Sequence, residues 1–169
     1  MLIFLIGFMG CGKSYTGRHL APLLGYDFID TDHLIENNEG MPIKEIFETK
    51  GEQYFRTKEQ EFLQTLQPEQ NLVISTGGGL PCFFDNMDVM NKIGITIYLN
   101  RSKTKVIERL IKGQQKRPLL TGLLPEEIAS FYDEKLKTRS SFYEKAKIHA
   151  GDADVDEIIN GIQNLNLIN

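Results

Sequence analysis

The chain has 169 residues, which suits one compact domain and is long enough to bury a hydrophobic core. Apolar residues make up 41% of the chain and charged residues 25%, proportions that are ordinary for a soluble globular protein. The formal net charge of −4 gives no basic surplus, so nucleic acid is not expected as the main partner.

The first half of the chain alternates apolar runs with segments of helical spacing. Residues 1–6 are apolar without a basic lead-in, too short for a signal core or a membrane span, and they indicate a buried strand. Further strands are predicted at residues 26–29 and 72–75. Helices are predicted at 13–24, ended by Gly25, at about 32–38, capped by Thr31 or Asp32, and at 43–66, with a break near Gly51.

The second half continues the alternation. Strands are predicted at residues 93–99 and 146–150, and helices at 81–91, 102–111, 125–145 and 155–165. The stretch 112–124 exceeds an ordinary connection, and we expect it to form a functional flap.

This alternation indicates an α/β fold with a parallel sheet sandwiched by helices. Ligands of such sheets bind at the carboxyl ends of the strands. Three predicted strands end in loops rich in glycine or in charged and hydroxyl side chains, at residues 7–14, 30–32 and 76–79. We expect these loops to meet in one crevice.

The first of these loops is a P-loop. The sequence Gly7-Phe8-Met9-Gly10-Cys11-Gly12-Lys13-Ser14 meets the pattern G-x-x-x-x-G-K-[ST] between a predicted strand and a predicted helix. Backbone N–H groups would cup the phosphates, Lys13 would reach the outer phosphates, and the Ser14 hydroxyl would bind Mg²⁺. We predict a nucleoside triphosphate site formed by Gly10, Cys11, Gly12, Lys13, Ser14 and Tyr15.

Two aspartates, Asp30 and Asp32, follow the second predicted strand. One carboxylate beside a bound triphosphate could hold the waters of Mg²⁺, and the other could hydrogen-bond an acceptor hydroxyl and take its proton. Helix capping is the alternative role, above all for Asp32.

The third loop is Thr76-Gly77-Gly78-Gly79, which either lets backbone approach a ligand closely or forms a plain tight turn. Arg56 and Arg139 are candidates for binding an anion, although a solvated surface position is the ordinary role of either. Arg56 and Glu59 are three residues apart and could pair on a helix surface. Arg117, in the predicted flap, could neutralise charge on a transferring phosphate.

The two cysteines, Cys11 and Cys82, do not make a disulfide framework, and without nearby histidines they make a poor zinc site. Because no export signal is visible, we expect reduced thiols and a cytoplasmic protein that does not bind a membrane.

These motifs occur together in the order and spacing typical of shikimate kinases, which the sequence resembles from Leu2 to about Ala146. The segments that carry the resemblance are the P-loop, Asp30-Thr31-Asp32, Phe55-Arg56, Thr76-Gly77-Gly78-Gly79, Arg117-Pro118-Leu119-Leu120, and Arg139 with Tyr143.

The resemblance implies a P-loop NTPase fold like that of nucleoside monophosphate kinases. It is a three-layer α/β sandwich whose five-stranded parallel sheet has the order 2-3-1-4-5. The whole chain, 1–169, would be a single kinase domain with a shikimate-binding helical subdomain at about 32–62 and a lid at about 112–124. A monomer is expected.

The activity implied is transfer of the γ-phosphate of ATP to the 3-hydroxyl of shikimate, giving shikimate 3-phosphate and ADP in the pathway to chorismate and aromatic amino acids. Catalysis would fall to Lys13, Asp32 and Arg117, with Arg117 also contacting ATP. Shikimate would be bound by Asp32, Arg56, Gly78, Gly79 and Arg139. Mg²⁺ would be held by Ser14 and, through water, by Asp30.

The sequence departs from the family pattern at two places. Cys11 stands where serine or alanine is usual, and the stretch 150–154 lacks the basic residue that family members often carry near the adenine. No adenine contact is therefore assigned, although Arg109 is placed near the base. The alternatives are a kinase for another hydroxylated acid such as gluconate, and a P-loop module that binds nucleotide without catalysis.

Overall fold

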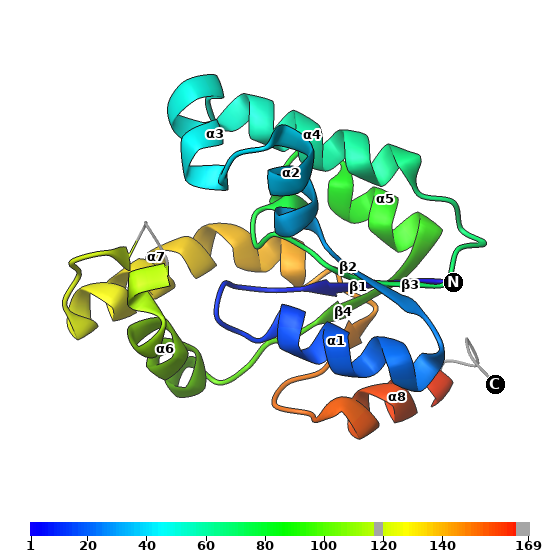
Figure 1. Cartoon of the computed structure of the whole chain (residues 1–169). Helices are drawn as coiled ribbons and strands as arrows, with labels where there is room; N and C mark the ends of the chain where they lie inside the picture. The colour runs from blue at the N-terminus through cyan, green and yellow to red at the C-terminus, as the bar shows by residue number, and fades with distance from the viewer. Residues whose placement is uncertain (117–119, 165–169) are drawn as a thin grey trace.

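A computed structural model describes residues 1–116 and 120–164, which form a parallel sheet between two layers of helices (Figure 1). The strand order is β2-β3-β1-β4-β5, as the resemblance implies, and every pairing is parallel. The strands are β1 (Leu2–Ile6), β2 (Asp27–Asp30), β3 (Leu72–Ser75), β4 (Gly94–Tyr98) and β5 (Ile148–His149).

The helices connect the strands and cover both faces of the sheet (Figure 1). They are α1 (Lys13–Leu24), α2 (Thr31–Glu39), α3 (Ile43–Lys50), α4 (Glu52–Thr65), α5 (Asn86–Ile93), α6 (Lys103–Lys112), α7 (Pro125–Tyr143) and α8 (Val155–Asn164), with short 3-10 turns η1 (Leu80–Cys82) and η2 (Gln114–Lys116).

Strand β1 lies at the centre, and all five of its residues are buried. Its side chains alternate between the two cores that flank the sheet. Ile3 and Leu5 pack with residues of α1, α6, α8 and the first half of α7, whereas Phe4 packs with residues of α4, α5 and the end of α7. This continuous apolar run fixes where the loop after β1 emerges.

Helices α2, α3 and α4 share a small core of their own, formed by Ile35, Ile46 and Phe55. These helices stand on one side of the carboxyl end of the sheet, and α6 with the first turns of α7 lies on the other side (Figure 1). The functional loops of β1, β2 and β3 emerge between the two groups.

The sequence placed most elements within a few residues, with three corrections. The N-cap of α2 is Asp30, whose side chain accepts from the Asp32 and His33 backbone N–H groups, so the expected cap at Thr31 or Asp32 was wrong. The predicted helix 81–91 divides into η1 and α5. The last strand is only the two residues of β5.

The expected lid, residues 112–124, begins at the end of α6. Gln114 Nε2 donates to the carbonyls of Leu120 and Leu123, at 2.7 Å each, and Leu120 is fully buried. Arg117 lies outside the described residues, so its expected contact with ATP remains a prediction.

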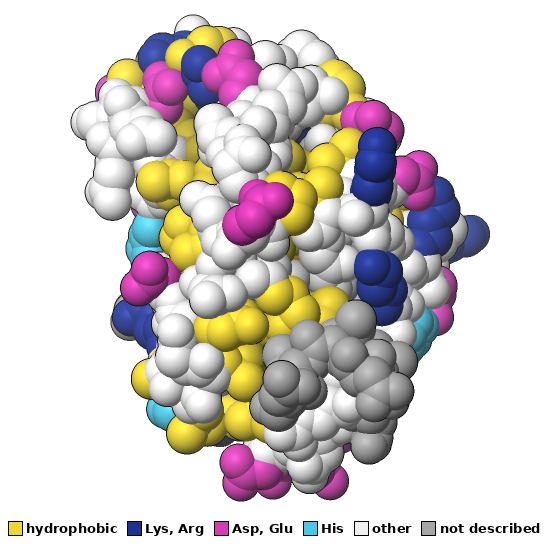
Figure 2. Space-filling view, turned by 90° about the vertical axis from the view of Figure 1, so that its right-hand side faces the viewer, with side chains coloured by type: hydrophobic (Ala, Val, Ile, Leu, Met, Phe, Trp, Pro, Cys, Tyr) yellow, Lys and Arg dark blue, Asp and Glu magenta, His cyan; other side chains and the backbone are white. Residues whose placement is uncertain are grey.

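Figure 2 views the molecule from the right-hand side of Figure 1, where strand β1 begins. Side chains of both charge signs are scattered over this face among apolar ones. Among the residues described, no helix is long and apolar enough to cross a membrane.

Candidate active site

The P-loop connects β1 to α1. Gly12, the residue before α1, has a φ of 96°, a conformation that is easy for glycine and strained for other residues. Lys13 follows and is buried, with its Nζ donating to the carbonyls of Gly7 at 2.9 Å and Phe8 at 3.0 Å. The loop therefore closes around the lysine ammonium and places positive charge at the helix N-terminus.

Ser14, Asp30 and Ser75 meet beside the P-loop. The Ser14 hydroxyl donates to Asp30 Oδ2 at 2.6 Å and lies 3.2 Å from Ser75 Oγ. The parallel register explains this meeting, because Asp30 and Ser75 are partners at the ends of β2 and β3. These hydroxyl and carboxylate oxygens form a cluster at the place where Mg²⁺ was predicted from the sequence.

Asp32 lies in the first turn of α2 and faces the glycine loop. A Cβ added to Gly77 would stand 2.6 Å from Asp32 Oδ1, so a larger residue at this position would displace the carboxylate. Burial and the nearby charge of Asp30 raise the pKa of Asp32 to about 6, whereas Lys13 acts in the opposite direction. Asp32 is therefore a carboxylate whose proton affinity lies close to neutral pH, as a general base requires.

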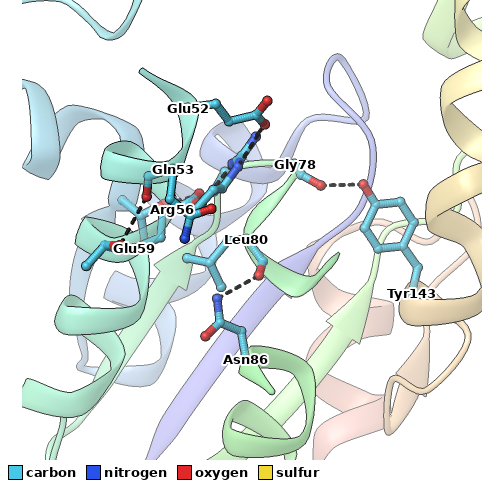
Figure 3. Close-up of polar contacts among 11 residues, drawn as sticks. Glu52, Gln53, Arg56, Glu59, Gly78, Leu80, Asn86 and Tyr143 are labelled. Atoms are coloured by element: carbon cyan, nitrogen blue, oxygen red, sulfur yellow. Dashed lines mark hydrogen bonds and ion pairs between the residues drawn. The ribbon is translucent and has the colours of Figure 1, made fainter. Parts of the chain in front are cut away.

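Arg56, which lies between Glu52 and Glu59 (Figure 3), is buried, and this corrects the expectation of a surface pair with Glu59. Its NH1 donates to Glu59 Oε2 and its NH2 to Glu52 Oε1, each at 2.8 Å. The guanidinium also lies over the Phe83 ring, 4.3 Å from the centroid. Arg56 is thus fixed in direction before any ligand arrives.

Gly79 brings the third loop against this arginine. A Cβ added to Gly79 would stand 2.6 Å from Arg56 NH1 and 2.8 Å from the guanidinium carbon. The same loop approaches the second arginine at Gly78, whose added Cβ would stand 3.5 Å from Arg139 NH1. Gly79 therefore serves close approach to Arg56, which a plain tight turn does not explain, whereas Gly78 lies at ordinary contact distance from Arg139.

Glu59 was not predicted as part of the site. It is fully buried beside Arg56, and its Oε1 makes no hydrogen bond to any residue of the described ranges. Burial raises the pKa of Glu59 to about 7, although Arg56 opposes this shift. Its three-residue spacing from Arg56 was visible in the sequence, but the burial of the pair was not.

One cavity of about 980 Å³ runs along the P-loop. Its lining includes Asp30, Asp32, Ser75 and Gly78, together with Tyr15, whose side chain is exposed. The predicted residues Gly10, Cys11, Gly12, Lys13 and Ser14 also line it.

The far end of this cavity contains Arg109, which was expected near the base, and two basic residues that were not predicted from the sequence, Arg101 and Lys105. Lys105 pairs with Asp152 at 3.0 Å, and Arg109 NH1 donates to the Cys11 carbonyl at 3.2 Å. Basic charge at this end therefore comes from α6 and the residues before it, whereas the loop after β5 supplies acidic side chains. Arg101 follows β4 and Lys105 lies in the first turn of α6, so their place just after a strand end was the available signal.

Both cysteines are free thiols. In the ranges that the structure describes, no group of three or more His, Cys, Asp or Glu side chains is arranged to hold a metal. A metal at this site would therefore rely on hydroxyl and carboxylate oxygens, water and phosphate oxygens.

The site lies at the carboxyl edge of a sheet of order 2-3-1-4-5. It combines a P-loop, a general-base candidate and two arginines that flank a glycine loop. This combination defines a P-loop kinase that acts on a small molecule. A sequence profile of the family described as "Shikimate kinase" matches residues 9–164. The chain belongs to the shikimate kinase family.

Relatives agree with this assignment over nearly the whole chain. The shikimate kinase of Parabacteroides distasonis is 40% identical over 96% of this chain and 98% of its own length. That of Azobacteroides pseudotrichonymphae is 48% identical over 86% of both chains. The similarity thus covers the described loops and not the P-loop alone.

Solved structures give the same result. The shikimate kinase of Bacteroides thetaiotaomicron has a TM-score of 0.90 at 35% identity, covering 99% of both chains. The enzyme of Acinetobacter baumannii, solved in complex with shikimate, has a TM-score of 0.82 at 36% identity over 98% of this chain and 92% of its own. A gluconokinase from Sinorhizobium meliloti, with 17% identity and a TM-score of 0.52, shares the fold alone.

Proposed function

We propose that this chain transfers the γ-phosphate of ATP to the 3-hydroxyl of shikimate, giving shikimate 3-phosphate and ADP, in the pathway to chorismate and aromatic amino acids. The observation that carries the proposal is that two arginines from different helices lie against the glycine loop, Arg56 beside Gly79 and Arg139 beside Gly78. Planar guanidinium groups bind a carboxylate through paired hydrogen bonds, and shikimate is a small carboxylate with several hydroxyls.

On the donor side, the backbone of Gly10, Cys11 and Gly12 cups the triphosphate and Lys13 neutralises its outer phosphates. Tyr15 lines the same cavity next to Ser14. Arg117, carried by the lid 112–124, closes over the phosphates and excludes water. Phosphoryl transfer depends mainly on positioning and charge, so Lys13 and Arg117 contribute more than a base does.

On the acceptor side, Arg56 and Arg139 hold the carboxylate, and the backbone N–H groups of Gly78 and Gly79 contact the substrate. Asp32 accepts a hydrogen bond from the attacking hydroxyl and takes its proton. The α2–α4 helices, about 32–62, act as the shikimate-binding subdomain, since their core positions Arg56.

Mg²⁺ fits the oxygen cluster of Ser14 and Asp30, because hydroxyl and carboxylate oxygens are the ligands that this ion prefers. Ser14 would bind the ion directly and Asp30 through water. When bound, Mg²⁺ neutralises phosphate charge. We further propose that the enzyme works in the cytoplasm as a monomer.

Substitution of Asp30 by asparagine tests the metal role. Asparagine is as good an N-cap as aspartate, so the start of α2 should survive while the charge is lost. We expect the Mg²⁺ concentration for half-maximal activity to rise about 10-fold or more, the usual effect of losing an outer-sphere partner. The measurement is a Mg²⁺ titration of activity at saturating ATP and shikimate, and an unchanged midpoint would count against the assignment.

Substitution of Gly79 by alanine tests the acceptor side. Its φ of −89° suits alanine, so the effect comes from the added methyl, which must displace the Arg56 guanidinium. We expect the KM for shikimate to rise about 10-fold, equivalent to about 1.4 kcal/mol, with the KM for ATP unchanged.

Gly161→Ala in α8 is the matched control for this alanine substitution, because its Cβ would meet only the side chain of Ile148 at 3.9 Å. Its kinetics should equal those of the natural chain. Equal KM values for shikimate in the two variants would contradict the placement of the acceptor beside Arg56.

An acceptor screen tests the proposed function itself. Purified protein with ATP and Mg²⁺ is offered shikimate, gluconate, a nucleoside monophosphate or no acceptor, and ADP release is followed. We expect rapid ADP release with shikimate alone. Release that is faster with gluconate, or that ignores shikimate, would reject the proposal.

A further inference from the structure

The glycine loop is held by side chains from two distant elements. Gly77 N–H donates to Thr31 Oγ1 of α2 at 2.8 Å, and the Gly78 carbonyl accepts from the Tyr143 hydroxyl of α7 at 2.5 Å. Both hydrogen bonds join residues far apart in the sequence. Side chains of α2 and α7 therefore help to fix the conformation of a loop whose glycines are intrinsically mobile.

Two further carbonyls of the loop are bonded by the 3-10 turn η1 that follows it. Those of Gly77 and Gly79 accept from the backbone N–H groups of Leu80 and Cys82, at 3.1 and 2.8 Å. By contrast, the N–H groups of Gly78 and Gly79 make no hydrogen bond to a residue in the described ranges. These two donors remain available to a ligand.

Tyr143 is suited to fix one of these donors. A trans peptide is planar, with its C=O and N–H pointing in opposite directions, and the described chain has no cis peptide. Holding the Gly78 carbonyl toward Tyr143 therefore directs the Gly79 N–H away from Tyr143. Figure 3 shows Tyr143 and Arg56 on opposite sides of the loop, so that donor points toward the side of Arg56.

The surroundings of Tyr143 hold its side chain in place and keep its hydroxyl a hydrogen-bond donor. Its side chain is fully buried and its ring packs against Tyr98, with centroids 5.2 Å apart. Burial raises the pKa of Tyr143, so the hydroxyl keeps its proton and remains a donor. Arg139 lies one helical turn earlier on α7, which brings the second arginine to the same face as the hydroxyl.

We propose that Tyr143 is a positioning residue for the acceptor: its hydroxyl locks the Gly78–Gly79 peptide so that the backbone donors and Arg139 present one preformed site to shikimate. Thr31 performs the matching task at Gly77. This inference rests on the acceptor site proposed above, and it adds two residues that contact the loop but not the substrate.

Tyr143→Phe keeps the ring and removes the one hydroxyl. We expect the KM for shikimate, and its dissociation constant by calorimetry, to rise about 10-fold, the effect of one lost positioning hydrogen bond. The KM for ATP and the dissociation constant for ADP should stay within about two-fold. Tyr98→Phe, which removes a hydroxyl from the ring packed against Tyr143, is the control and should leave all four values unchanged.

A merely structural role would lower the melting temperature without separating the two substrates. The inference is overturned if Tyr143→Phe leaves the KM for shikimate unchanged, or raises both KM values equally. If Tyr143→Phe does not fold, Thr31→Val decides: a selective rise in the KM for shikimate supports the locked loop, and an unchanged value overturns it.

Arg139→Met separates this inference from the acceptor site on which it rests. If that variant raises the KM for shikimate while Tyr143→Phe does not, the acceptor site stands and the role of Tyr143 falls. If Arg139→Met also leaves the KM unchanged, the acceptor site itself is misplaced, and the inference falls with it.

Discussion

Lys13→Met should reduce kcat by about 10³-fold or more, equivalent to about 4 kcal/mol of transition-state stabilisation. The lysine is buried, and its ammonium is held by the Gly7 and Phe8 carbonyls at the start of α1. Methionine retains most of the side-chain volume but loses the charge and the three donors. Because phosphoryl transfer spreads charge over the phosphate oxygens, a preorganised cation beside them is the largest contribution that one side chain can make.

The measurement is steady-state kcat with saturating ATP and shikimate, with circular dichroism to verify folding. Lys103→Met is the matched control, since Lys103 is exposed and pairs with the surface residue Asp133 at 2.6 Å. It should retain full activity. A Lys13→Met enzyme with more than about a tenth of normal kcat would contradict the role given to Lys13.

Asp32→Asn should give the second large loss, about 10²- to 10⁴-fold in kcat, because general-base catalysis and hydroxyl positioning disappear together. Asparagine has nearly the same shape, so its fit beside Gly77 is retained. Asp27→Asn, which changes an exposed carboxylate at the first residue of β2, is the control and should have no effect. Near-normal turnover of Asp32→Asn would show that the assigned role is wrong.

The pH dependence of the natural enzyme provides a second test of Asp32. Burial raises its pKa to about 6, so the carboxylate that accepts a proton is present above this pH and is lost as pH falls through it. We expect kcat/KM for shikimate to fall tenfold per pH unit below about 6. An inflection near 4, the range of an ordinary aspartate, would contradict a buried base.

Local patterns were enough to predict the P-loop and the edge of the sheet. A glycine-rich turn of this pattern between an apolar run and a helix commonly binds phosphate. Parallel strands bring their carboxyl ends to one edge of the sheet, so the contact between Ser14 and Asp30 could be expected. The N-cap of α2 was placed one or two residues late, because α2 begins directly after β2 and the last residue of the strand, Asp30, is itself the cap.

Burial of Arg56 and Glu59 could not be predicted in this way. Their spacing on α4 is that of an ordinary surface pair. Gly79 and Phe83, which lie against Arg56, come from more than 20 residues further along the chain, and Gly77 of the same loop lies against Glu59. The hydrogen bond between Tyr143 and Gly78 spans 65 residues and depends on how α7 crosses the sheet. Such contacts are set by tertiary packing, which local periodicity does not encode.

A crystal structure with ADP and shikimate tests the central claim most directly, namely that the P-loop and the glycine loop hold donor and acceptor for direct transfer. We predict that the shikimate carboxylate lies on Arg56 and Arg139, and that its 3-hydroxyl lies within hydrogen-bond distance of Asp32 and faces the ADP phosphates. Shikimate bound elsewhere, or with its carboxylate turned toward the P-loop, would contradict it.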